Sequence, residues 1–214
     1  MRRTVWLLLA ALLVAGAIMP ADGMAQAAPA SMANTLTPAE DAEGWKLLFD
    51  GKTLLGWTRR GGGADWKVEE GAITAVATGG PSYIGTAYEY INFHLKADFW
   101  QDEGHNSGIF LRGPRAAEAP INQKSSYEIN ISDEHKTFPT GSIVDLHRFD
   151  PVPKTAGKWN TYEIMAEGDH LVVKLNGTTT IDLKDGTHYS GIIALQAFGT
   201  GKVRFRNVKI RPLK

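Results

Sequence analysis

Three segments of the sequence alternate polar and apolar residues, which is the pattern of a β-strand with one buried face. The polar positions are Arg112 in segment 108–112, Glu128 and Asn130 in 126–132, and Gln196 in 191–196. On a curved sheet these side chains would converge in one concave groove. Guanidinium, carboxylate and amide groups supply planar donors and acceptors for sugar hydroxyls, so the pattern favours a carbohydrate site.

Two other residue types extend this candidate site. Trp100 and Trp159 offer apolar platforms for a sugar ring, whereas three other tryptophans, Trp45, Trp57 and Trp66, are expected in the core.

Histidines in expected loops are acid–base candidates, because the free side chain titrates near neutrality. They are His105, His135 and His147. No histidines have the spacing of metal ligands, and the chain contains no cysteine. No cofactor is therefore evident, and ligand spacing gives no support to a divalent cation.

The elements that must position these residues are mostly short strands with Gly-rich turns between them. Asn176-Gly177 predicts a two-residue hairpin turn. A change of apolar parity at Asn207 predicts a bulge or bend in the last strand. The pattern predicts an all-β sandwich of two antiparallel sheets, with long loops over 113–124 and 133–139. The expected strands are 66–68, 72–76, 91–100, 108–112, 126–132, 161–166, 170–175, 178–183, 191–196 and 202–210.

The first 27 residues read as a cleavable signal peptide. Arg2 and Arg3 precede the apolar run 5–18, and residues 25–27 form a small-x-small cleavage site. The apolar run is short for a transmembrane span. We therefore expect a periplasmic or secreted protein with no membrane association after cleavage.

The remaining chain divides into a flexible leader, 28–36, and one domain, 37–214. Thr37, Pro38 and Glu40 predict a single short helix at the start of the domain. Cleavage would remove two of 23 basic and one of 23 acidic side chains, which leaves a net charge of −1. A near-neutral chain has no electrostatic reason to bind nucleic acid or an anionic membrane.

Several motifs in order resemble the 3-keto-disaccharide hydrolase domain family. The resemblance covers roughly residues 37 to 213. It implies a concanavalin A-like jelly roll and cleavage of glycosides that carry a ketone at carbon 3. It also implies a functional link to a sugar 3-oxidoreductase that supplies the substrate. The matching segments are 44–57, 66–73, 106–112, 127–129, 140–143, 158–160, 175–177, 194–196 and 203–210.

Strand parity and the resemblance together suggest roles in this chemistry. Glu128 is expected to be the base or acid, and Arg112 to clamp the enolate or a hydroxyl. His147 or Asp145 is the candidate for a second proton-transfer group. The substrate-binding residues are expected to be Asn130, Gln196, Trp100, Asn106 and His105.

The sequence departs from the family pattern at two places. Many members have a histidine soon after the Ala-Leu-Gln segment, where this chain has Ala197-Phe198. Many also have a histidine before the Gly-Ser segment, where this chain has Pro139-Thr140. An altered or inactive site is therefore one alternative.

Two other functions remain open. A non-catalytic carbohydrate-binding module would use the same groove. A conventional retaining glucanase would need a strand motif of the type Glu-x-Asp-x-(x)-Glu, whereas this strand has Asn130 at the central position.

Overall fold

The computed structural model describes residues 33–214, so the predicted signal peptide and most of the predicted leader lie outside it. Helix α1 (Pro38–Ala42) begins with the predicted capping box. The Glu40 backbone N–H donates to Thr37 Oγ1 at 3.2 Å, and the Thr37 N–H donates to Glu40 Oε2 at 3.0 Å. Asn34, at the end of the leader segment, is buried and hydrogen-bonded to Asn207 in the last strand. This end of the leader is therefore held against the domain.

All pairings among the described strands are antiparallel. The strands are β1 (Lys46–Leu47), β2 (Trp57–Arg60), β3 (Ala64–Glu69), β4 (Ala72–Thr86), β5 (Phe93–Gln101), β6 (Asn106–Gly113), β7 (Tyr127–Ile131), β8 (Asn160–Glu167), β9 (His170–Leu175), β10 (Thr178–Lys184) and β11 (Ile192–Pro212). The predicted all-β jelly-roll sandwich is confirmed.

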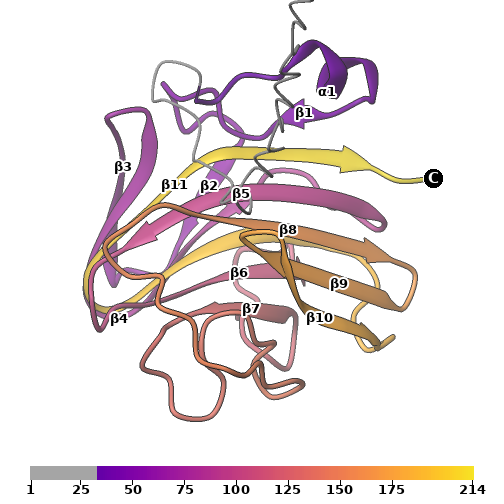
Figure 1. Ribbon diagram of the computed structural model, residues 1–214. Coiled ribbons are helices and arrows are strands. Elements are labelled where there is room, and N and C mark those ends of the chain that lie inside the picture. The colour runs from indigo at the N-terminus through magenta and orange to yellow at the C-terminus, as the bar shows by residue number, and fades with distance from the viewer. Residues whose placement is uncertain (1–32) are drawn as a thin grey trace, which may run out of the picture.

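The two layers of the sandwich are joined by β4 and β11, which pair with each other along most of their length. The C-terminal half of β11 pairs with β5, which continues through β8 and β9 to β10. Its N-terminal half pairs with β6, and β6 pairs with β7. Figure 1 shows this arrangement, with β11 passing from one layer to the other.

The sequence pattern predicted two strands, 191–196 and 202–210, where the structure has the single strand β11. Gly199 and Gly201 occur between these segments and looked like a turn. They have φ values of 79° and 115°, and the register with β4 shifts between Ala197 and Gly199. Glycine tolerates positive φ, so β11 bends here without losing its pairing. The two layers are thus continuous through β11.

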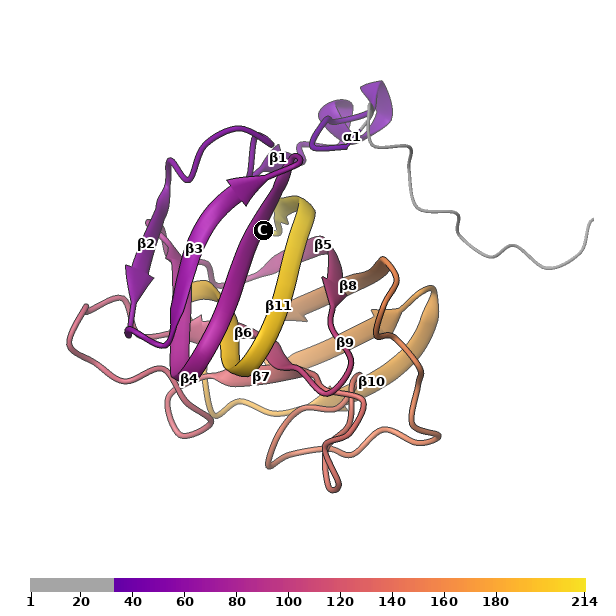
Figure 2. The ribbon, with the colours of Figure 1, turned by 90° about the vertical axis from the view of Figure 1, so that its left-hand side faces the viewer.

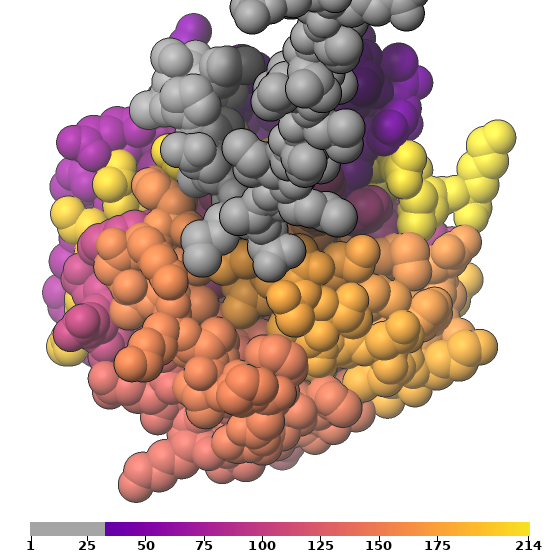
Figure 3. Space-filling view, viewed as in Figure 1, coloured from indigo at the N-terminus to yellow at the C-terminus, as the bar shows by residue number. Residues whose placement is uncertain are grey.

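Apolar residues on the inner faces of the two layers form the main core. Ile109 and Leu111 of β6 and Ile129 of β7 face Phe99 of β5 and Tyr162 of β8 within it. In the space-filling view, β8 to β10 cover one side of the molecule (Figure 3). No helix in the described part of the chain is long and apolar enough to span a membrane.

Of the tryptophans expected in the core, Trp45 and Trp66 are buried. Trp57 is half-buried at the edge of the core, with its indole N–H donating to Leu48 O at 2.7 Å.

Two local predictions are confirmed. Asn176 and Gly177 have φ values of 49° and 84° between β9 and β10, as a type I′ turn requires. Asn207 has a φ of 52°, and the register between β11 and β5 shifts between Arg206 and Lys209. The Asn207 amide donates to Asp98 Oδ2 at 2.7 Å, which holds the bulge in place.

Candidate functional site

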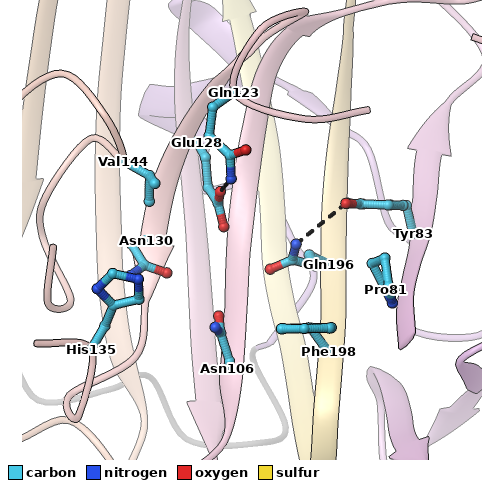
Figure 4. Close-up of a pocket in the computed structure, with 10 residues that line it drawn as sticks. All are labelled: Pro81, Tyr83, Asn106, Gln123, Glu128, Asn130, His135, Val144, Gln196 and Phe198. Atoms are coloured by element: carbon cyan, nitrogen blue, oxygen red, sulfur yellow. Dashed lines mark hydrogen bonds between the residues drawn. The ribbon is translucent and has the colours of Figure 1, made fainter. Parts of the chain in front are cut away.

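A pocket of about 340 Å³ opens on the face of β4, β6, β7 and β11 that points away from the main core. Figure 4 shows side chains from these strands, and from the loops after β6 and β7, directed toward its centre. Only one of the residues that line it is acidic. The lining residues are Pro81, Tyr83, Asn106, Gln123, Glu128, Asn130, His135, Val144, Gln196 and Phe198.

The floor of the pocket is built from rows of residues paired across strands. In the central row, Asn130 of β7 pairs with Gly108 of β6, which pairs with Gln196 of β11, which pairs with Tyr83 of β4. Glu128 occupies the next row. Because side chains two residues apart share a face, Glu128 and Asn130 point to the same side.

Glu128 is the titratable group at the centre of this pocket. Its side chain is buried, and burial raises its pKa to about 7, with a smaller contribution from the negative charge of Asp145. Gln123 partly opposes this shift because its amide donates to the Glu128 carboxylate. A carboxyl group with this pKa can release or accept a proton near neutral pH.

Gly108 makes room for the Glu128 carboxyl group. A Cβ at Gly108 would lie 3.0 Å from Glu128 Oε1 and 3.1 Å from its Cγ. The missing side chain therefore lets the carboxyl group lie over the central row.

Two amide oxygens in the pocket have no hydrogen-bond partner among the described residues, namely Gln196 Oε1 and Asn106 Oδ1. The Gln196 amide nitrogen donates to the Tyr83 hydroxyl at 3.4 Å. Buried amide oxygens without partners are costly, and a ligand with hydroxyl donors would satisfy them.

Asn130 and His135 anchor the loop that forms one wall. The Asn130 amide donates to Phe138 O, while its Oδ1 accepts the Ile131 N–H at 2.9 Å. His135 Nδ1 accepts the Phe138 N–H at 2.9 Å. A neutral His135 therefore carries its proton on Nε2.

The structure does not bring Arg112 into this pocket. The register of β6 shifts opposite Ile193, so that Leu111 and Arg112 together face one residue of β11, and Arg112 has a φ of 57°. Such a bulge redirects the side chain. The guanidinium donates instead to backbone oxygens of three loops, at Ile91, Gly168 and His188.

Four other predicted site residues also lie outside the pocket lining. His105 is buried beside Thr200 O, 3.0 Å from its Nδ1, and burial lowers its pKa. Trp100 is half-buried on β5, in the other layer. His147 is exposed, and Asp145 is exposed at an adjoining cavity.

Trp159 is also absent from the pocket lining. Arg206 lies over its ring at 4.0 Å from the centroid, and Arg204 at 5.5 Å. These two guanidinium groups lie beside the ring, where a sugar was expected to bind.

Several lining residues were not predicted from the sequence. Tyr83 and Pro81 lie in a segment with Gly79 and Gly80, which obscured the alternation of β4. Gln123 lies in the β6–β7 loop, where strand parity carries no information. Phe198 occupies the position after Ala-Leu-Gln-Ala, and the family comparison of that segment was the one signal that could have found it.

No group of three or more histidine, aspartate or glutamate residues within 33–214 is arranged to hold a metal ion.

The fold and the pocket define this chain as an all-β jelly-roll domain with a buried carboxyl group set among amide side chains. The chain belongs to the family of 3-keto-α-glucoside-1,2-lyase-like domains, which it matches over residues 44–211. It is 29% identical over 158 residues to a 3-keto-disaccharide hydrolase of Bacteroides thetaiotaomicron. That match covers 58% of this chain and 53% of the relative, so the chain spans about half the length of that protein.

Solved structures share the fold. One, provisionally described as a glycosyl hydrolase of Parabacteroides distasonis, has a TM-score of 0.74 and 24% identity, covering 85% of this chain and all of the other. The carbohydrate-binding module CBM66 of Bacillus subtilis has a TM-score of 0.58 and 21% identity, with 72% and 94% coverage.

Proposed function

We propose that this protein cleaves glycosides that carry a ketone at carbon 3 of the sugar. The observation that carries the proposal is the buried Glu128, with a pKa of about 7, in a pocket of a family named for this chemistry. A carboxyl group with a pKa near the working pH suits proton transfer. A surface that only binds sugar would not require that pKa.

The ketone determines the first step. It acidifies the C2–H bond, so ionised Glu128 removes that proton and the electron pair passes into an enolate on the C3 oxygen. When the enolate collapses, the C1–O bond breaks and a C1=C2 double bond forms. The departing oxygen takes up a proton, and water then adds across the C1=C2 bond of the enone. The water oxygen bonds to C1, the proton held by Glu128 passes to C2, and the proton lost by the water restores the group that protonated the departing oxygen.

Amide groups can stabilise the enolate in place of the guanidinium that the sequence suggested. Gln123 and Gln196 both direct amide groups at the pocket (Figure 4). Each amide nitrogen uses one N–H within the protein, toward Glu128 and Tyr83 respectively, which leaves a second N–H that can donate to the enolate. Donors that are already in place stabilise developing charge without a cost of reorganisation.

Tyr83 is suited to protonate the departing oxygen. Burial raises the pKa of its hydroxyl group, which therefore keeps its proton at neutral pH. The hydroxyl accepts a hydrogen bond from Gln196, so its own proton stays free to be donated toward the pocket.

A retaining glucanase mechanism fits the pocket poorly. Double displacement requires two carboxyl groups about 5 Å apart. Glu128 is the only acidic residue among those that line the pocket, and Glu134 lines a different cavity.

The alternative of a non-catalytic carbohydrate-binding module is favoured by the fold shared with CBM66. It predicts saturable sugar binding with no product release.

The test is product release from a 3-keto nitrophenyl glucoside by the purified protein and by Glu128→Gln. We expect release from the keto substrate, with kcat lower in the variant by about 10³-fold, because proton transfer by a placed group contributes about 10²–10⁴-fold. The wild-type rate should rise with pH through about 7, as Glu128 ionises.

The unoxidised nitrophenyl glucoside is the control. Equal release from both glucosides would contradict the requirement for the ketone, and an unchanged rate in Glu128→Gln would remove Glu128 from the mechanism. Sugar binding without any release would support the binding module.

A further inference from the structure

A second cavity adjoins the proposed sugar pocket. This recess, of about 440 Å³, is lined mostly by apolar residues. It shares Pro81 and Tyr83 with the pocket and is otherwise lined mainly by the β6–β7 loop. Figure 2 shows that loop beside β2 and β4. The residues of the loop that face the recess include Ala117, Ala119 and Ile121.

The side chains of the recess differ in kind from those of the pocket. Alanine, proline and isoleucine replace most of the amides, and the polar side chains that belong to the recess alone are Arg60, Asn122 and the exposed Glu118. Asn122 Oδ1 accepts the Lys124 N–H at 2.9 Å, and its backbone N–H donates to Ser125 Oγ at 3.1 Å. A second sugar would find few hydrogen-bond partners among these side chains, whereas an apolar ring would remove their apolar surface from water.

Arg60 forms a fixed wall of the recess and is not free to bind an anion. Its guanidinium donates to Pro114 O at 2.7 Å, to Ala116 O at 3.2 Å and to Arg115 O. These bonds hold the loop next to β2. Ile121 is packed with Phe110, Ile192 and Ala194, and this small cluster supports the floor.

Tyr83, like Pro81, lines both cavities, and its hydroxyl group is the polar group that the two have in common. Its ring packs edge-on against Phe110, with centroids 5.3 Å apart, which fixes its position. A glycoside whose sugar fills the pocket would place its C1 oxygen at this boundary and its leaving group in the recess.

We infer that the recess is a subsite for an apolar, aromatic leaving group attached to carbon 1 of the keto sugar. This inference rests on the proposed function for the identity of the sugar. The subsite would make the protein selective for aryl and arylalkyl glycosides over simple alkyl glycosides and disaccharides.

The experiment compares benzyl and methyl 3-keto-glucosides, each as both anomers, because the two alcohols have similar acidity and differ in apolar size. We expect KM to be at least about tenfold lower for the benzyl substrate than for the methyl substrate, because apolar contacts in a pocket contribute discrimination of this order. Ala119→Asp should raise the KM for the benzyl substrate about tenfold and leave the KM for the methyl substrate within about twofold, since a charge placed among the apolar side chains of the recess disfavours the ring.

Ala116→Asp, on the exposed side of the same loop, is the matched control and should change neither KM. Equal KM values for the two substrates, or an Ala119→Asp variant that behaves as wild type, would overturn the subsite. Isothermal titration with unoxidised benzyl and methyl glucosides tests the recess without turnover. If no keto glycoside is cleaved, the proposed function fails, but the titration still tests the subsite. Tighter binding of the benzyl glucoside would support the subsite, and equal binding of the two glucosides would overturn it.

Discussion

At the scale of single residues, the site depends on where a charged side chain is buried. Glu128 and Arg112 are both buried, but their surroundings differ. Arg112 is satisfied by three loop oxygens, whereas Glu128 has one donor, Gln123, and faces a cavity. A satisfied buried charge contributes to structure, and an under-satisfied one in a cavity is available for chemistry.

Glu128 should make stability depend on pH. Its carboxyl group has a pKa of about 7 when folded and an ordinary value of 4.5 when unfolded. Between these values the folded chain holds a proton that the unfolded chain has released, so stability falls as pH rises and is lowest above about 7. Across this pH range the free energy of unfolding should fall by an amount on the order of 3 kcal/mol.

Urea unfolding of wild type and Glu128→Gln at pH 5 and pH 8 measures this effect. The variant should lose less stability than wild type between the two pH values. A parallel decline in both proteins would mean that the pKa of Glu128 is not raised.

Arg112 should prove structural. Arg112→Met leaves the oxygens of Ile91, Gly168 and His188 without their donor, which should cost about 2–4 kcal/mol of stability. We expect a clearly lower Tm and, well below that Tm, a kcat within about threefold of wild type. Arg115→Met, on an exposed side chain, is the control. If Arg112→Met had a normal Tm but had lost its activity, Arg112 would have a role in the site and not in stability.

At the scale of elements, cross-strand register decides which side chains meet. Gly108 and Asn130 come from the consecutive strands β6 and β7, whereas Gln196 comes from the distant β11. The pairing of these strands places the three residues in one row. The bulge in β6 removes Arg112 from the same face. Pairing and bulges therefore define the pocket more than the composition of any single strand.

Gly108 gives a prediction at this scale. In Gly108→Ala the new Cβ would press on the Glu128 carboxyl group, 3.0 Å away. A displacement of a few tenths of an ångström should lower kcat about tenfold, with little change in Tm. Gly62→Ala is the control, because nothing lies within 4 Å of a Cβ there. Wild-type kcat in Gly108→Ala would show that the position of the carboxyl group is not critical.

At the scale of the whole molecule, the sandwich places a rigid pocket floor between two loops that can vary. The main core lies on one side of β6, β7 and β11, and the pocket lies on the other. The β6–β7 loop and the loop after β7 supply the walls. Substrate choice can therefore change through the loops without disturbing the core.

Export would depend on the N-terminal segment of the whole chain. We propose that the protein is periplasmic or secreted and that cleavage after Ala27 leaves Ala28 as the first residue. Intact-mass measurement of the exported protein should give the mass of 28–214. Replacing both Ala25 and Ala27 with arginine should block cleavage, whereas Gln26→Arg should not, since only the small positions are recognised. Export of the full 214-residue chain by wild type would contradict the signal peptide.

The sequence alone determined the class of fold and half of the pocket. Alternation and turn residues identified most of the strands, the Asn176-Gly177 hairpin and the bulge at Asn207, because these signals are local. They did not predict β1 or β2, the second half of β4, or the continuity of β11. The same alternation placed Glu128, Asn130 and Gln196 on outward faces, and the pocket contains all three. Asn106, at the start of its strand, and His135, one of the acid–base candidates, also line it.

Only the tertiary structure decided the rest. The bulge that turns Arg112 away is defined by its partner strand, and no local pattern announces it. Trp100 and Gln196 look equally available in sequence, but they lie in different layers. Tyr83 and Gln123 reach the pocket through a bent strand and a loop. The pKa of Glu128 depends on burial by segments distant in sequence, because desolvation is a property of the assembled surroundings.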